Sequence, residues 1–195
     1  MKKFKTCSLL VLALVGFSSA HAQSIGAYAS YFNADDLENV YGGGALLQVP
    51  VSQNLYVILR VAHYPGSEYS SRLGPLEVPV FADVDFTPID IGLGLQGALG
   101  NSTTVVYADA GFTYLMADGT FMVNEFTSDA KFEDENGWYG ALGVRSGEKT
   151  QGFLEVQFRS SKADISSEES SQINDYMKEI DLDHLAVNLG VRFSW

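Results

Sequence analysis

Few side chains in this sequence could carry covalent chemistry. A hydrolytic mechanism needs a nucleophile paired with a base such as histidine. Cys7 and His21 fall within the first 22 residues, which we expect to be removed, so the remaining candidate bases are His63 and His184. Neither of these histidines has a serine directly beside it in the sequence. We therefore expect no enzyme activity, no cofactor and no thiol chemistry.

Isolated charged residues within otherwise apolar or small-residue stretches form a second set of candidates. Guanidinium groups pair well with carboxylates, and buried charges of both signs are tolerated when they are paired and hydrogen-bonded. Such a set could form a path for ions or protons, or a salt-bridged plug, and we favour the plug. The candidates are Arg60, Asp90, Asp109, Arg145, Glu155, Arg159 and Arg192.

An acidic cluster could bind divalent cations or the basic surface of a partner. Carboxylates are common ligands of Ca²⁺, but their spacing here matches no EF-hand loop. Solvated loops that repel one another are the simpler interpretation. The cluster comprises Asp129, Glu133, Asp134 and Glu135.

The C-terminal stretch, His184 to Trp195, is the element around which the other stretches can be ordered. Its odd positions from Leu185 onward are all large and apolar, whereas its even positions are polar or small. Strict alternation of this kind is typical of a β-strand with two different faces. The stretch ends on an aromatic ring, which is favoured at a membrane interface.

Seven further stretches alternate in the same way and predict strands. Short turns between them alternate with longer or acidic connections, for which we predict loops at 65–86, 117–136 and 162–181 and a short acidic loop at 33–39. This asymmetry is typical of transmembrane barrels. Both faces of the first stretch hold aromatic residues, so its facing is not determined. The seven stretches are 24–33, 41–49, 55–64, 89–96, 106–114, 138–145 and 153–159.

Lysine usage separates a membrane barrel from a secreted soluble barrel with the same alternation. A solvated sheet face would carry lysine and glutamate in quantity, whereas a narrow lumen needs small residues and few charges. All lysines after residue 22 fall in predicted loops or turns, which favours the membrane barrel. They are Lys131, Lys149, Lys162 and Lys178.

Residues 1–22 have the three parts of a secretory signal peptide. Lysines at positions 2, 3 and 5 precede an apolar run from Leu9 to Phe17, and the segment ends in Ala20-His21-Ala22. We expect cleavage after Ala22 and a single barrel domain at 23–195. The net charge is −12, or −15 without the three lysines, which argues against nucleic acid as a partner.

The strand number, the loop asymmetry, the signal segment and the aromatic C-terminal strand resemble the small eight-stranded outer-membrane barrels of Gram-negative bacteria, the OmpA/OmpX class. The resemblance implies an all-β, antiparallel transmembrane barrel that is monomeric in the outer membrane. Both termini and the short turns would lie in the periplasm, and the longer acidic loops would lie outside. Its surroundings would be outer-membrane lipids and lipopolysaccharide. The terminal strand resembles the signal that the barrel assembly machinery recognises, here Leu189, Val191, Phe193 and Trp195.

Members of this class include adhesins, small porins and lipid-modifying enzymes, so the fold alone does not give the function. Barrels that remove acyl chains from lipopolysaccharide place a histidine and a serine close together, which neither His63 nor His184 matches. We expect a structural or surface-interaction role, with a small porin as the alternative. Side chains can fill a barrel of eight strands. The predicted filling comprises Tyr56, Tyr107, Tyr139 and Phe153, with space left by Gly92, Gly94, Gly111 and Gly143.

Overall fold

The computed structural model describes most of the chain after residue 22. The predicted signal segment, 1–22, lies outside the described residues. The described residues include no helix that is long and apolar enough to cross a membrane. The described ranges are 23–34, 37–73, 78–100, 102–123, 126–131, 135–164, 179–181 and 183–195.

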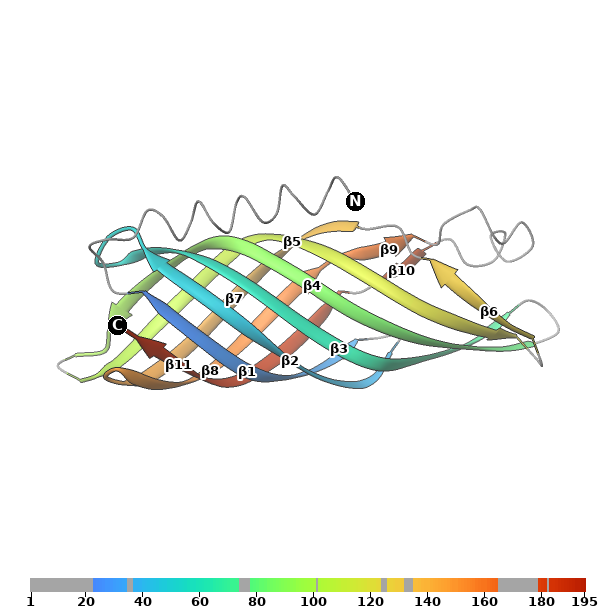
Figure 1. The fold of residues 1–195 in the computed structure, drawn as a ribbon, viewed down its shortest axis with the longest axis horizontal. Coiled ribbons are helices and arrows are strands. Elements are labelled where there is room, and N and C mark those ends of the chain that lie inside the picture. The colour runs from blue at the N-terminus through green and yellow to red at the C-terminus, as the bar shows by residue number, and fades with distance from the viewer. Residues whose placement is uncertain are drawn as a thin grey trace.

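The described residues form a closed, eight-stranded antiparallel β-barrel (Figure 1). Neighbouring strands pair in the order β1-β2-β3-β4-β5-β7-β8-β11, and β11 pairs back to β1. Three short strands lie outside this ring: β6 extends a hairpin from β5, and β9 pairs with β10. The strands are β1 Ser24–Ala34, β2 Leu37–Pro50, β3 Leu55–Leu73, β4 Val78–Ala98, β5 Thr104–Val123, β6 Phe126–Lys131, β7 Glu135–Gly147, β8 Thr150–Ser160, β9 Lys162–Asp164, β10 Glu179–Asp181 and β11 His184–Ser194.

The alternation in the sequence becomes the two faces of the barrel wall. In β11, Asn188 and Arg192 are buried inside the barrel, whereas Leu189 and Val191 are 65% and 48% exposed on its outside. Large apolar side chains that no described residue covers are typical of a lipid-facing wall. The facing of β1, which the sequence left open, is now clear: Tyr28 is buried in the interior, and its neighbours in the sequence face outward.

Two of the predicted loops are wrong, because β3, β4 and β5 continue far beyond the predicted strand ends. The hairpin of β3 and β4 keeps a regular register through Tyr69↔Ala82 and Ser71↔Val80, inside the segment predicted as a loop at 65–86. Likewise β5 and β6 pair within 117–136. Serine, glycine and charged residues suggested loops, but β-propensity depends on context, and hydrogen bonding between adjacent strands outweighs it here.

The two remaining acidic connections also contain strand. The short loop predicted at 33–39 is narrower than expected, because β1 runs to Ala34 and β2 begins at Leu37. Within 162–181, β9 and β10 form a small hairpin base, with Glu179 opposite Asp164. The acidic connections therefore start from paired strands.

The barrel has two different ends. At the end that we call the short-turn end, β2 and β3, β4 and β5, and β7 and β8 are joined by turns of a few residues. The chain also ends there, where the amide of Trp195 donates to the carbonyl of Gln23 at 3.1 Å. At the opposite end, which we call the hairpin end, β3, β4 and β5 project as a sheet (Figure 1).

Candidate functional site

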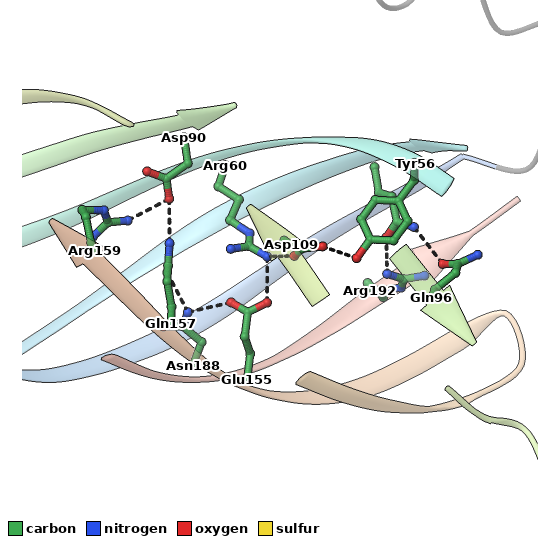
Figure 2. A network of polar contacts seen from close by, with 11 residues as sticks. Tyr56, Arg60, Asp90, Gln96, Asp109, Glu155, Gln157, Arg159, Asn188 and Arg192 are labelled. Carbon is green, nitrogen blue, oxygen red and sulfur yellow. Dashed lines mark hydrogen bonds and ion pairs between the residues drawn. The ribbon is translucent and has the colours of Figure 1, made fainter. Parts of the chain in front are cut away.

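The centre of the barrel interior holds a buried ion-pair network (Figure 2). Arg60, on β3, is 1% exposed and bonds through Nη2 to carboxylates on two other strands. One is Asp109 of β5 and the other is Glu155 of β8, whose Oε2 lies 2.7 Å from Nη2. A guanidinium buried between two carboxylates joins separate parts of the wall across the lumen.

A second ion pair lies closer to the hairpin end. Nη2 of Arg159 donates to Oδ2 of Asp90 at 2.7 Å, and both side chains are 1% exposed. The same carboxylate accepts from Gln157 at 2.8 Å and from Thr113 at 2.5 Å. Asn188 links the two ion pairs, because its amide donates to Glu155 at 2.9 Å and to Gln157 at 3.1 Å.

Aromatic rings fill the space beside these charges. The hydroxyl of Tyr56 donates to Asp109, and the guanidinium of Arg60 lies 5.4 Å from the centre of the Tyr139 ring. A Cβ added at Gly94 would collide with the Tyr56 ring and with Asp109. Gly92 makes room for Tyr139 and Gly143 for Tyr107 in the same way, but Gly111 instead faces the backbone of β4. The tyrosines and the charged side chains therefore pack against one another in the lumen.

Two arginines at the short-turn end are held by glutamines instead of carboxylates. Nη2 of Arg145 donates to Oε1 of Gln96 at 2.5 Å. Arg192 donates through Nε to Gln151 at 2.8 Å and through Nη1 to Gln48. The sequence placed these arginines in the lumen but did not identify the glutamines as their partners, because pairing across the lumen depends on how the strands are staggered.

The interior at the hairpin end is packed with rings. Phe32 stacks on His184 with centroids 4.1 Å apart and makes an edge contact with Tyr64 at 4.9 Å. These rings, with Phe86 and Leu115, line a cavity of about 10 Å³ above Arg159, room for no more than about one water molecule. Side chains therefore meet across the described interior at three levels: glutamine–arginine pairs, ion pairs and aromatic packing.

The wall itself is interrupted near the hairpin end. The pairs Gly43↔His63 and Leu37↔Tyr69 share one register, yet the residues between them, 38–42 on β2 and 64–68 on β3, do not pair with each other. Both stretches still form pairs with their other neighbours, β1 and β4. Pro65 lacks an amide hydrogen, and Gly66 has a φ of 61°, so both interrupt regular pairing. The register of β3 against β4 also shifts here.

Comparison with known proteins bears on the fold. The chain resembles OprG from Pseudomonas aeruginosa with a TM-score of 0.64 and 18% identity, over 90% of this chain and 96% of the other. It resembles Neisserial surface protein A with a TM-score of 0.61 and 10% identity, over 90% and 100% of the two chains. The fold is that of the small eight-stranded outer-membrane barrels. Ail, the attachment invasion locus protein of Yersinia pestis, has the same barrel fold, with a TM-score of 0.50 and 11% identity over 89% and 97% of the chains.

Comparison of the sequence with protein families and curated proteins adds nothing to this likeness of fold. No protein-family model matches this chain, and no curated protein matches it.

The two histidines occupy different surfaces of the barrel. His63 faces outward, and its Nδ1 lies 3.0 Å from Oγ1 of Thr87 on the adjacent strand β4. His184 faces inward, with Nε2 3.0 Å from Nη1 of Arg159. Thr87 could not be found by looking for a serine beside His63, because the two residues meet only through strand pairing.

The structure describes all of the predicted assembly-signal residues and two of the four residues of the acidic cluster. In the terminal strand of the barrel, Phe193 and Trp195 face outward with 50% and 64% exposure, next to Leu189 and Val191 on the same face. Of the acidic cluster, Glu133 and Asp134 lie outside the described residues, whereas Asp129 belongs to β6 and Glu135 to β7. Among the described residues, no group of three or more His, Cys, Asp or Glu side chains could hold a metal ion.

Proposed function

We propose that this protein is a monomeric integral outer-membrane barrel whose interior is closed and whose role is structural or interactive at the cell surface. The observation that carries the proposal is the network of buried contacts from Arg192 to His184, which places side chains across the lumen along its described length. Because a filled lumen cannot serve as a path for solutes, the outer wall and the two ends of the barrel remain available for function.

The outward-facing aromatic residues support insertion in the outer membrane. The rings of Tyr31 and Tyr41 lie 5.1 Å apart on β1 and β2, and Trp138 and Phe158 lie 5.1 Å apart on β7 and β8. With Trp195 at the short-turn end, they would form aromatic girdles at the two interfaces. We place the short-turn end and both termini in the periplasm, after removal of 1–22 as a signal peptide.

The hairpin end would then carry the interaction surface. The described parts of the acidic segments that the sequence identifies lie at this end, and a negative surface would favour divalent cations or basic partners over polyanions. Outer-membrane lipids and lipopolysaccharide would surround the wall, and the barrel assembly machinery would recognise the terminal strand. Two of the similar structures are of proteins named for the cell surface or for attachment, which is consistent with this role.

Single-channel recording in planar bilayers tests the closed interior. We expect the purified barrel to insert without producing steady conductance steps, and we expect Arg60→Ala to lower stability without opening a pore. A porin of known conductance, inserted by the same method, is the positive control. Reproducible steps in the wild type whose ion selectivity changes with the charge at position 60 would show that the protein is a small channel.

A second candidate function is passage of small apolar molecules through the wall, and the break between β2 and β3 favours it. The interior beside this break is apolar, because Val40, Tyr64 and Val84 are all buried there. An apolar molecule that displaced the Phe32 and Tyr64 rings at the hairpin end could leave sideways without crossing the ion pairs. Proteoliposome uptake of an apolar fluorescent probe would be slower for Pro65→Val than for the wild type, whereas Pro50→Val at the short-turn end would have no effect. Equal uptake by all three proteins would rule this function out.

A further inference from the structure

The short-turn end of the lumen holds two cations without an acidic partner. Arg145 and Arg192 are 4% and 7% exposed, and neither forms an ion pair with a described carboxylate. The carboxylate of Asp109, deeper in the lumen, is already bonded to Arg60 and Tyr56. Burial of a cation is costly unless an anion or several hydrogen bonds replace its water.

Hydrogen bonding at the guanidinium group of Arg145 is incomplete. Nε and Nη1 of Arg145 are buried and have no hydrogen-bond partner among the described residues. Nη2 donates to Gln96, and the guanidinium lies 5.6 Å from the centre of the Tyr107 ring. A buried donor without an acceptor costs about 1–3 kcal/mol, and more when it is charged. Arg145 therefore lacks acceptors that an oxyanion would supply.

Two glutamine side chains connect the arginines. Oε1 of Gln96 accepts from Arg145 and also from Nε2 of Gln48 at 3.2 Å, while Oε1 of Gln48 accepts from Arg192. Gln96 and Gln48 are thus two linked side-chain amides, with Arg145 bonded to the first and Arg192 to the second. Amide oxygens are neutral acceptors, and phosphate or a similar oxyanion offers more oxygens to the same forked donors.

This end of the lumen is accessible from the aqueous side. Gln96 and Gln151 are partly exposed, in contrast to the buried network behind them, and both lie next to the short turns. Gln151 is also bonded to the carbonyls of Gly147 and Glu148 in the turn between β7 and β8. A ligand would therefore arrive from water along the barrel axis and would displace glutamine side chains, leaving the wall intact.

We propose that the short-turn mouth of this barrel binds a small free oxyanion of the phosphate class between Arg145 and Arg192. The glutamines hold the arginines in place when the site is empty and turn aside when the oxyanion binds. Gln48 and Gln151 would then donate through their amide nitrogens. The site depends neither on conduction nor on the surface role, so it can fail or succeed separately from the proposed function.

Isothermal titration calorimetry with inorganic phosphate tests the site on the folded barrel in maltoside micelles, which contain no phosphate of their own. We expect saturable binding of one phosphate per barrel, competition by sulfate and none by chloride at equal ionic strength. Arg192→Gln should weaken binding at least about tenfold, because charged hydrogen bonds are lost. Lys149→Gln, which removes an exposed cation from the turn beside the mouth, should bind like the wild type.

A measurement on the unmodified chain covers the case in which Arg192→Gln does not fold. In ¹H–¹⁵N spectra of the wild type, phosphate should shift the Nε–H signals of Arg145 and Arg192, two of the five arginines, and leave those of Arg60 and Arg159 in place. Absence of saturable heat, or equal weakening by Lys149→Gln, would overturn the proposal. Shifts of all arginine signals together would overturn it as well, because they indicate a general salt effect.

Discussion

Replacing Arg60 by methionine is expected to destabilise the barrel strongly while leaving its shape unchanged. Methionine, like arginine, has an unbranched side chain, but it carries no charge. The cation between Asp109 and Glu155, whose side chains are 0% and 2% exposed, is therefore lost. Removing one partner of a buried pair costs about 3–5 kcal/mol. Tyr56 still donates to Asp109 and Asn188 still donates to Glu155, so we expect about 3 kcal/mol, the lower part of that range.

The cost can be measured by equilibrium urea unfolding in lipid vesicles. The fluorescence of the two tryptophans, Trp138 and Trp195, reports the transition from lipid to water. The slope against urea should not change, since it follows the surface exposed on unfolding. Lys149→Met, at an exposed turn, is the matched control and should change the free energy of unfolding by less than about 0.5 kcal/mol.

A double-mutant cycle separates the ion pair from side-chain volume. If the uncompensated carboxylate is the cause, Glu155→Gln in the Arg60→Met background should recover part of the loss, because the leftover charge is removed. A loss below about 1 kcal/mol for Arg60→Met alone would refute the reasoning. It would mean that water enters the lumen and replaces the missing guanidinium.

Two further predictions follow from packing and closure. Gly94→Val should destabilise the barrel by about 1–3 kcal/mol in the same urea assay, because its side chain would overlap Tyr56; Gly97→Ala, with open space around its Cβ, is the control and should have little effect. Deleting Phe193 to Trp195 should abolish the folded, heat-modifiable band on gels, whereas shortening 162–181 should retain it, because only the first change removes part of the closing strand. Equal loss of the folded band in both deletions would contradict the role given to the terminal strand.

The facing of most strands could be predicted from the sequence because alternation has a period of two residues. Arg60, Asp90 and Glu155 were assigned to the lumen from their neighbours alone, and each is buried there. Partner choice could not be predicted in this way. Asp90 and Arg159 lie on β4 and β8, 69 positions apart, and they meet because of the tilt and stagger of the strands.

Strand ends were harder to predict than strand faces. The segment Ser67 to Leu73 has the composition of a loop, yet it pairs with β4 along its length. Its partner strand is close in the sequence, with Leu73 opposite Val78 and Ser67 opposite Val84, but composition alone does not show which residues pair. For the same reason, the sequence did not show that Thr87 lies beside His63. Nor did it show that Gln48 lies beside Arg192, 144 positions further along the chain.

The register between the first and last barrel strands has a consequence for biogenesis. β1 and β11 align over eleven positions, from Ser24↔Ser194 to Ala34↔His184, and neither can find the other until every intervening hairpin has formed. Until then two edges of roughly 36 Å each, at about 3.3 Å per residue, would present unpaired amides and carbonyls. In a hydrocarbon environment each such group costs several kcal/mol. We therefore expect β1 and β11 to pair while the barrel inserts rather than afterwards, and a strand edge that pairs with them temporarily would lower the cost of the unclosed intermediate.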